Sequence, residues 1–195
     1  MTPEPQLLRA SAMCLALVGT LESCQSDQSQ DSMAATRLRI EARVMDHRVP
    51  EIVGRDPTGT AWTHAFPAAR PALIFLYRED CGACARTQDA WRALADAGAS
   101  RADIISATFA PAADVPYLAH PLVHDVRVQD GREFRRFFGV ADVVPITVLV
   151  NGQGFPIKAR LGVLRQSDIE EFARALENER VETRTPSPGA TGRAR

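Results

Sequence analysis

This sequence has almost no excess of charge of either sign, few cysteines and few long apolar runs. Lysine and arginine together number 23 and aspartate and glutamate 24, so the formal net charge is −1. A net charge so near zero gives no electrostatic indication of nucleic-acid binding, and we expect no nucleic-acid partner. Four cysteines in 195 residues are too few for a disulfide scaffold. The composition, 45% hydrophobic and 24% charged, indicates one soluble globular domain with tails.

A short apolar stretch near the N-terminus predicts export. It runs from Ala10 to Leu21, directly after Arg9, and is followed by the polar run "QSDQSQDS". The stretch is too short for a transmembrane helix but is typical of the central segment of a secretory signal. We therefore predict that residues 1–24 are a signal sequence and that the protein is located in the periplasm or cell envelope.

Cys24 lies in a segment that resembles a bacterial lipoprotein signal. Leu21 stands three residues before it and Ser23 directly before it. The resemblance implies that Cys24 is lipidated and tethers the protein to a membrane. Glu22 departs from the small or apolar residue usual at its position, so plain export with cleavage elsewhere stays open. A buried N-terminal helix with Cys14 in the core is a further alternative.

Predicted strands and helices alternate along the rest of the chain. Residues 25–36 are polar and predict a flexible tether, 37–180 a folded domain and 181–195 a disordered tail. We predict strands near 37–44, 60–66, 71–77, 102–109, 143–150 and 155–161, and helices at 81–97, 131–140 and 168–180, the last capped by Ser167. This order indicates an α/β domain whose central mixed sheet is flanked by helices.

Two cysteines follow the apolar run "ALIFLY" at the start of a predicted helix. Unpaired N–H groups in the first helical turn stabilise an anion, and the thiolate is the nucleophile of disulfide exchange. Cys84 lies three residues after Cys81, on the same helical face and within reach of its sulfur. The placement therefore favours redox chemistry for this pair.

The order of these elements resembles the thioredoxin fold, in which an apolar strand leads into CxxC at a helix start. A proline-led strand at Pro145, a hairpin and a final helix complete the resemblance. Residues 49–66, "VPEIVGRDPTGTAWTHAF", resemble the N-terminal β extension of TlpA-like exported thiol–disulfide oxidoreductases, a family that includes reductants of cytochrome c maturation. The resemblance covers residues 45 to 180 and implies an insertion before the proline-led strand.

The resemblance implies a cofactor-free enzyme that exchanges or reduces disulfides in exported protein partners. It implies that Cys81 attacks and Cys84 resolves the mixed disulfide, with an upstream thiol donor regenerating the pair and the protein acting as a monomer. Gly82 lets a substrate chain approach closely, whereas Ala83 replaces the proline of thioredoxin's own motif.

The peptide bond between Val144 and Pro145 is expected to be cis, because in the resembling fold it is cis and lies against the disulfide. The backbone of Val144 would then pair with the substrate chain, which makes Val144 and Pro145 substrate-binding residues.

Two positions depart from the thioredoxin pattern. Asp80 stands where thioredoxin has tryptophan, and Phe75 stands where relatives often have a buried aspartate or asparagine. The proton acceptor that such a carboxylate supplies to the second cysteine is therefore missing. Glu79 and Asp80 add negative charge beside Cys81, which would raise the pKa of its thiol.

Other uses of CxxC fit these residues less well. His120 and His124 have zinc-like internal spacing, but the segment that separates them from Cys84 is far longer than in a zinc finger, and we expect no metal site. Copper-delivery relatives of the fold have CxxxC, so the two-residue spacing in this chain argues against copper delivery. A peroxiredoxin would need proline and threonine where this chain has Ile74 and Arg78. A binding module with an inert CxxC staple remains an alternative, although so small a loop adds little stability.

Overall fold

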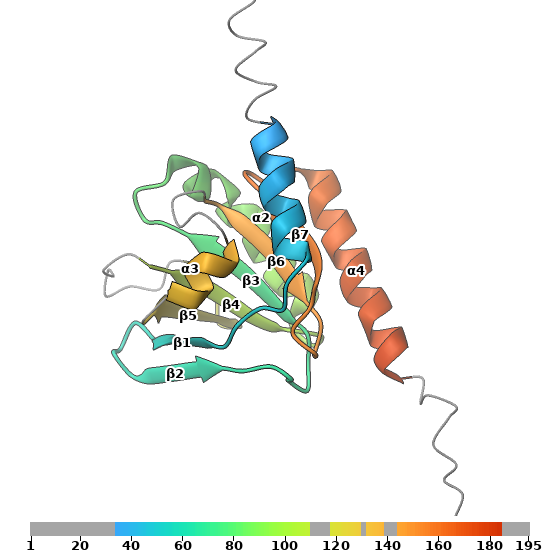
Figure 1. The fold of residues 1–195 in the computed structure, drawn as a ribbon, viewed down its shortest axis with the longest axis horizontal. Helices are drawn as coiled ribbons and strands as arrows, with labels where there is room; N and C mark the ends of the chain where they lie inside the picture. The colour runs from blue at the N-terminus through green and yellow to red at the C-terminus, as the bar shows by residue number, and fades with distance from the viewer. Residues whose placement is uncertain (1–33, 110–117, 130–131, 139–143, 185–195) are drawn as a thin grey trace, which may run out of the picture. The chain divides into compact units, whose positions relative to one another are not determined.

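The computed structural model describes residues 34–109, 118–129, 132–138 and 144–184. Residues 40–195 form one compact unit and residues 1–39 another. The larger unit contains a seven-stranded sheet in the order β2-β1-β5-β4-β3-β6-β7 (Figure 1). Its elements are β1 (Ile52–Arg55), β2 (Ala61–His64), β3 (Ala72–Tyr77), α2 (Gly82–Gly98), β4 (Asp103–Thr108), β5 (Val123–Val128), α3 (Arg132–Phe138), β6 (Ile146–Val150), β7 (Pro156–Leu161) and α4 (Gln166–Arg184).

Strand β3 is the centre of the sheet. All six of its residues are buried, as expected of a continuous apolar run covered on both faces. It pairs in parallel with β4 and antiparallel with β6, so the sheet is mixed. The hairpin β1–β2 adds to the sheet beside β5, which confirms the predicted N-terminal β extension. The α/β class is therefore as predicted.

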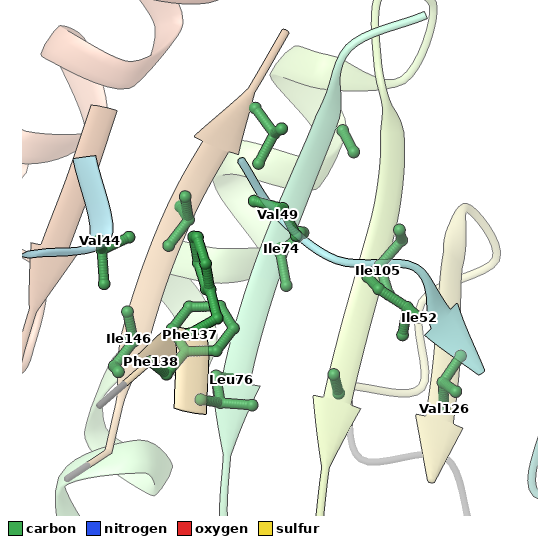
Figure 2. Close-up of a cluster of buried hydrophobic side chains, with 14 of the residues drawn as sticks. Val44, Val49, Ile52, Ile74, Leu76, Ile105, Val126, Phe137, Phe138 and Ile146 are labelled. Atoms are coloured by element: carbon green, nitrogen blue, oxygen red, sulfur yellow. The ribbon is translucent and has the colours of Figure 1, made fainter. Parts of the chain in front are cut away.

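Helices cover both faces of the sheet. One apolar cluster packs α3 and residues 40–44 against it, as Figure 2 shows for Val44, Phe137 and Phe138 over the strands that carry Ile74 and Ile146. The second cluster packs α2 and α4 against the other face, through Trp91, Leu94, Phe172 and Leu176. Alternate residues of β3 enter the two clusters, which is the period-two pattern of a strand in the middle layer.

The predicted strand at 37–44 is wrong, because residues 34–45 form a helix. The apolar residues Leu38, Ile40, Ala42 and Val44 alternate in sequence, but only Ile40 and Val44 are buried. Their spacing of four places both on one face of a helix. The helix also begins inside the range 25–36 predicted as a tether.

The last helix also differs from its prediction. It begins at Gln166, so Ser167 lies within the helix and is not its cap. Asp168 instead accepts a hydrogen bond from the backbone N–H of Arg165 at 2.8 Å, which satisfies one of the unpaired donors at the helix start. The helix continues to Arg184, past the predicted end of the domain at 180.

Several predictions lie outside the described residues. They are the signal sequence 1–24 with Cys14 and Cys24, residues 25–33 of the tether, and residues 185–195 of the tail. No helix in the described ranges combines the length and the apolar character that crossing a membrane requires.

Candidate redox site

Cys81 occupies the N-cap position of α2. Its backbone is extended, with φ −98° and ψ 103°, and its sulfur accepts a hydrogen bond from the backbone N–H of Cys84 at 3.1 Å. The same N–H would donate to a Cys81 thiolate, and the positive end of the helix dipole acts in the same direction. Cys81 is also partly exposed, so its sulfur combines access with a site that stabilises negative charge.

Cys84 is joined to Cys81 by a disulfide, with 5.2 Å between the Cα atoms. It is 0% exposed and lies in the cluster between the sheet, α2 and α4. A buried thiol in apolar surroundings resists ionisation and cannot be reached by a protein partner. The two cysteines therefore differ in access in the way that separate attacking and resolving roles require.

The segment Val144–Pro145 approaches Cys81 through the carbonyl of Val144. The carbonyl oxygen of Val144 is 3.7 Å from the sulfur of Cys81, although 63 residues separate them in sequence. The peptide bond between Val144 and Pro145 is cis, as expected. Pro145 is buried and its carbonyl accepts a hydrogen bond from the N–H of Gly162 at 2.8 Å, which fixes this loop to the end of β7.

The two residues between the cysteines carry little side-chain bulk. Gly82 is exposed and Ala83 half-buried. A side chain added at Gly82 would first meet the Arg86 guanidinium, at 3.7 Å. Arg86 therefore folds back over the first turn of α2, and the sequence analysis did not single it out.

Comparisons place this architecture among solved structures. The thioredoxin domain of a thiol-disulfide oxidoreductase from Bacteroides vulgatus has TM-score 0.53 and 15% identity, over 67% of this chain and 96% of that one. A putative electron transfer protein from Aquifex aeolicus has TM-score 0.57 and 15% identity, over 70% and 95%. Yeast Sco1 has TM-score 0.55 and 15% identity, over 73% and 99%. The chain has a thioredoxin-like fold. No protein-family model and no curated protein sequence matches it.

In this thioredoxin-like fold the turn before Cys81 carries a charge pair that the sequence analysis missed. Arg78 donates from Nε and from a terminal nitrogen to the two carboxylate oxygens of Asp80, at 3.0 and 2.7 Å. The hydrogen bonds and charge of Arg78 lower the pKa of Asp80. Asp80 and Glu79 are both exposed, as expected. Arg78 therefore compensates part of the negative charge beside Cys81.

Substituting Arg78 by alanine is expected to raise the pKa of the Cys81 thiol in the reduced protein. The change leaves Asp80 ionised without its neighbouring positive charge, and a nearby anion disfavours a thiolate. Asp80→Asn should shift the thiol pKa in the opposite direction. Thiolate absorbance near 240 nm as a function of pH measures the thiol pKa in both variants. Asp89→Asn, an exposed position on α2, is the control. Equal thiol pKa values in all four proteins would contradict this electrostatic account.

Phe75, which stands where relatives often have a carboxylate, stacks on another aromatic ring. Phe75 is fully buried and its ring lies 5.2 Å from that of Trp91, at an interplanar angle of 19°. The indole N–H of Trp91 donates to the hydroxyl of Thr147 at 2.8 Å, so its polar atom is paired. This thioredoxin-like core therefore places apolar bulk where relatives place a proton acceptor.

The two histidines with zinc-like spacing lie far from the cysteines. His124 is in β5, near its start, whereas Cys81 follows the end of β3, and the parallel pairing of β3, β4 and β5 puts these at opposite edges of the sheet. Both ring nitrogens of His120 are engaged, one with Asp96 at 3.1 Å and one with the N–H of Leu122 at 3.3 Å. In the described ranges no group of three His, Cys, Asp or Glu side chains could hold a metal ion.

His64 and His124 instead flank Trp62 in a stack of rings. The centroid distances from Trp62 are 6.0 Å to His64 and 5.8 Å to His124. Burial lowers the pKa of His64, opposed by the charge of Asp103 and assisted by that of His124. His64 Nε2 is buried and has no hydrogen-bond partner among the described residues. The folded protein therefore disfavours the protonated form of this imidazole.

The free energy of unfolding should consequently fall as pH falls from about 7 to about 5. The unfolded chain takes up a proton at an ordinary histidine pKa of about 6.5, whereas folded His64 takes it up only at lower pH. His64→Phe should reduce the slope of stability against pH, while the exposed His47→Gln should not. Urea unfolding at pH 7.5, 6.5 and 5.5 measures the slopes. An unchanged slope in His64→Phe would show that other groups cause the dependence.

Proposed function

We propose that this protein is a thiol–disulfide oxidoreductase that exchanges or reduces disulfides in exported protein partners. The observation that carries the proposal is the position of Cys81. It is partly exposed at a helix N-cap, disulfide-bonded to a buried Cys84 and beside a cis proline. A structural staple would need the disulfide but neither an exposed sulfur nor an N-cap position for it, and a loop this small contributes little stability.

The first step belongs to Cys81. Its thiolate attacks one sulfur of a substrate disulfide, the substrate S–S bond breaks, and a disulfide between Cys81 and the substrate forms. The departing substrate sulfur leaves as a thiolate and takes a proton from water. The N–H of Cys84 stabilises the charge on Cys81 before the attack.

The second step belongs to Cys84. Its thiol gives a proton to water, its sulfur attacks that of Cys81, and the second substrate sulfur leaves. The disulfide between Cys81 and Cys84 forms and the substrate has gained two electrons. A dithiol donor then reduces the pair by the same two exchanges. Phe75 itself offers no carboxylate to accept the proton of Cys84.

Val144 would position the substrate chain in both steps. Its carbonyl lies 3.7 Å from the attacking sulfur, close enough for an extended substrate chain to contact both. The carbonyl of Pro145 accepts a hydrogen bond from the N–H of Gly162, and this bond holds the neighbouring carbonyl of Val144 in place. The predicted signal at residues 1–24 and Cys24 supports an exported, lipid-anchored location, in which the domain meets partners at the membrane surface.

Catalysed reduction of a protein disulfide tests the proposal. With dithiothreitol as donor, the protein should accelerate the reduction of insulin, and the double substitution Cys81→Ser with Cys84→Ser should abolish the acceleration. Circular dichroism and the melting temperature should be nearly unchanged in the double variant, because the lost loop is small. A wild-type protein that does not accelerate insulin reduction would favour the binding module.

A further inference from the structure

A basic pocket lies on the α3 side of the sheet, and none of the proposed redox residues lines it. Its volume is about 340 Å³ and its lining residues are Arg43, His47, Arg48, Pro50, Arg136 and Phe137. All lie within the compact unit 40–195. We propose that this pocket binds a phosphate group, and that its source is the headgroup of an anionic phospholipid.

The charge of the pocket is uncompensated. In the part of the chain that the structure describes, neither Arg43, Arg48 nor Arg136 forms an ion pair. Elsewhere six basic side chains pair with carboxylates; they are Arg70, Arg78, Arg92, Arg101, Lys158 and Arg160. Three guanidinium groups around one pocket repel one another, and a bound anion would convert that repulsion into attraction.

Several contacts hold the basic groups in place. Arg43 donates to the backbone carbonyl of Arg136 at 3.2 Å, which joins the N-terminal helix to α3. The carbonyl of Arg43 is 3.2 Å from Nδ1 of His47 and so orients that ring, leaving its Nε2 for a ligand. The side chain of Arg48 packs over Gly154, whose φ of +91° and lack of a side chain allow the approach.

The shape and position of the pocket favour a lipid phosphate. At about 30 Å³ per water molecule, a volume of 340 Å³ leaves space for the atoms attached to a phosphate. Phe137 and Pro50 offer them an apolar wall. The pocket also adjoins the helix by which the chain enters the domain, after a segment predicted to be lipidated at Cys24. A membrane tether would bring the domain close to anionic headgroups, and basic residues near anionic membranes add affinity.

Two matched variants test the site in the full chain. Arg48→Gln with Arg136→Gln removes two pocket charges, while Arg86→Gln with Arg174→Gln removes two exposed charges elsewhere. Arg43 is kept because it contacts α3. The first probe is inorganic phosphate, and its binding is detected by NMR of the arginine side chains. Wild type and control should show the same phosphate-dependent shifts at the pocket arginines, and the pocket variant should bind about 25-fold more weakly, at about fivefold per arginine.

The second probe distinguishes a lipid from a free phosphate. Vesicles of phosphatidylcholine alone report binding through the apolar N-terminal stretch, and vesicles with added phosphatidylglycerol report the headgroup contribution. Wild type and control should gain the same affinity from phosphatidylglycerol, and the pocket variant should lose that gain. Equal losses in both double variants, or no phosphate-dependent shift at the pocket, would overturn the site. Phosphate binding without any gain from phosphatidylglycerol would overturn its assignment to lipid.

Discussion

Replacement of Cys84 by serine is expected to trap partners as mixed disulfides at Cys81. The attacking sulfur remains partly exposed at the start of α2, so the first exchange proceeds. The buried serine hydroxyl cannot attack Cys81, and the mixed disulfide persists. Non-reducing electrophoresis of Cys84→Ser with an oxidised protein substrate should show a new band that disappears on reduction.

The reverse replacement is the matched control. Cys81→Ser keeps Cys84, which is 0% exposed and therefore closed to a protein substrate. It should form little or no mixed disulfide under the same conditions. Equal trapping by the two variants would contradict the assignment of Cys81 as the attacking thiol.

Replacement of Asp168 by alanine is expected to lower the free energy of unfolding by about 3 kcal/mol. Asp168 is 1% exposed and accepts hydrogen bonds from Nε and a terminal nitrogen of Arg160, and from the backbone N–H of Arg165. The variant leaves Arg160 with the more distant Glu41, at 3.9 Å, and removes the cap of α4. Removing one partner of a buried pair is costly because the other loses its compensation.

Urea unfolding measures this loss, with Asp89→Ala as the control. The side chain of Asp89 is 97% exposed and pairs with Arg92 three residues on, so its removal should cost less than about 0.5 kcal/mol. A loss in Asp168→Ala no greater than in Asp89→Ala would mean that the contact between β7 and α4 does not depend on this pair.

The central strand and the redox helix could be predicted because their signals are local. The six apolar residues of β3 and the helix-forming run after Cys81 leave few alternatives. The segment 37–44 was ambiguous, because alternating apolar residues also contain the pair Ile40 and Val44 at helical spacing. Burial by the sheet and α3 decides between the two, and a sequence does not display that environment.

The cysteines and the proline of the site could be predicted from the sequence, whereas its charge pairs could not. Resemblance to known proteins indicated Val144 and Pro145, which no local pattern would bring to Cys81 across 63 residues. The pairing of Arg78 with Asp80 depends on the conformation of one turn. The sequence alone therefore indicated only the negative charge of Glu79 and Asp80 beside the thiol. The stack of His64, Trp62 and His124 joins β2 to β5, between which β1 lies, so it depends on the strand order of the sheet.

A redox titration of the native protein tests the central claim most directly. The native protein is equilibrated with mixtures of reduced and oxidised dithiothreitol and quenched with acid, its free thiols are then alkylated in denaturant, and modification of Cys81 and Cys84 is counted by mass spectrometry. The account predicts one reversible two-electron transition in which Cys81 and Cys84 become alkylated together while the fold is retained. A disulfide that is reduced only after the protein is denatured would contradict it.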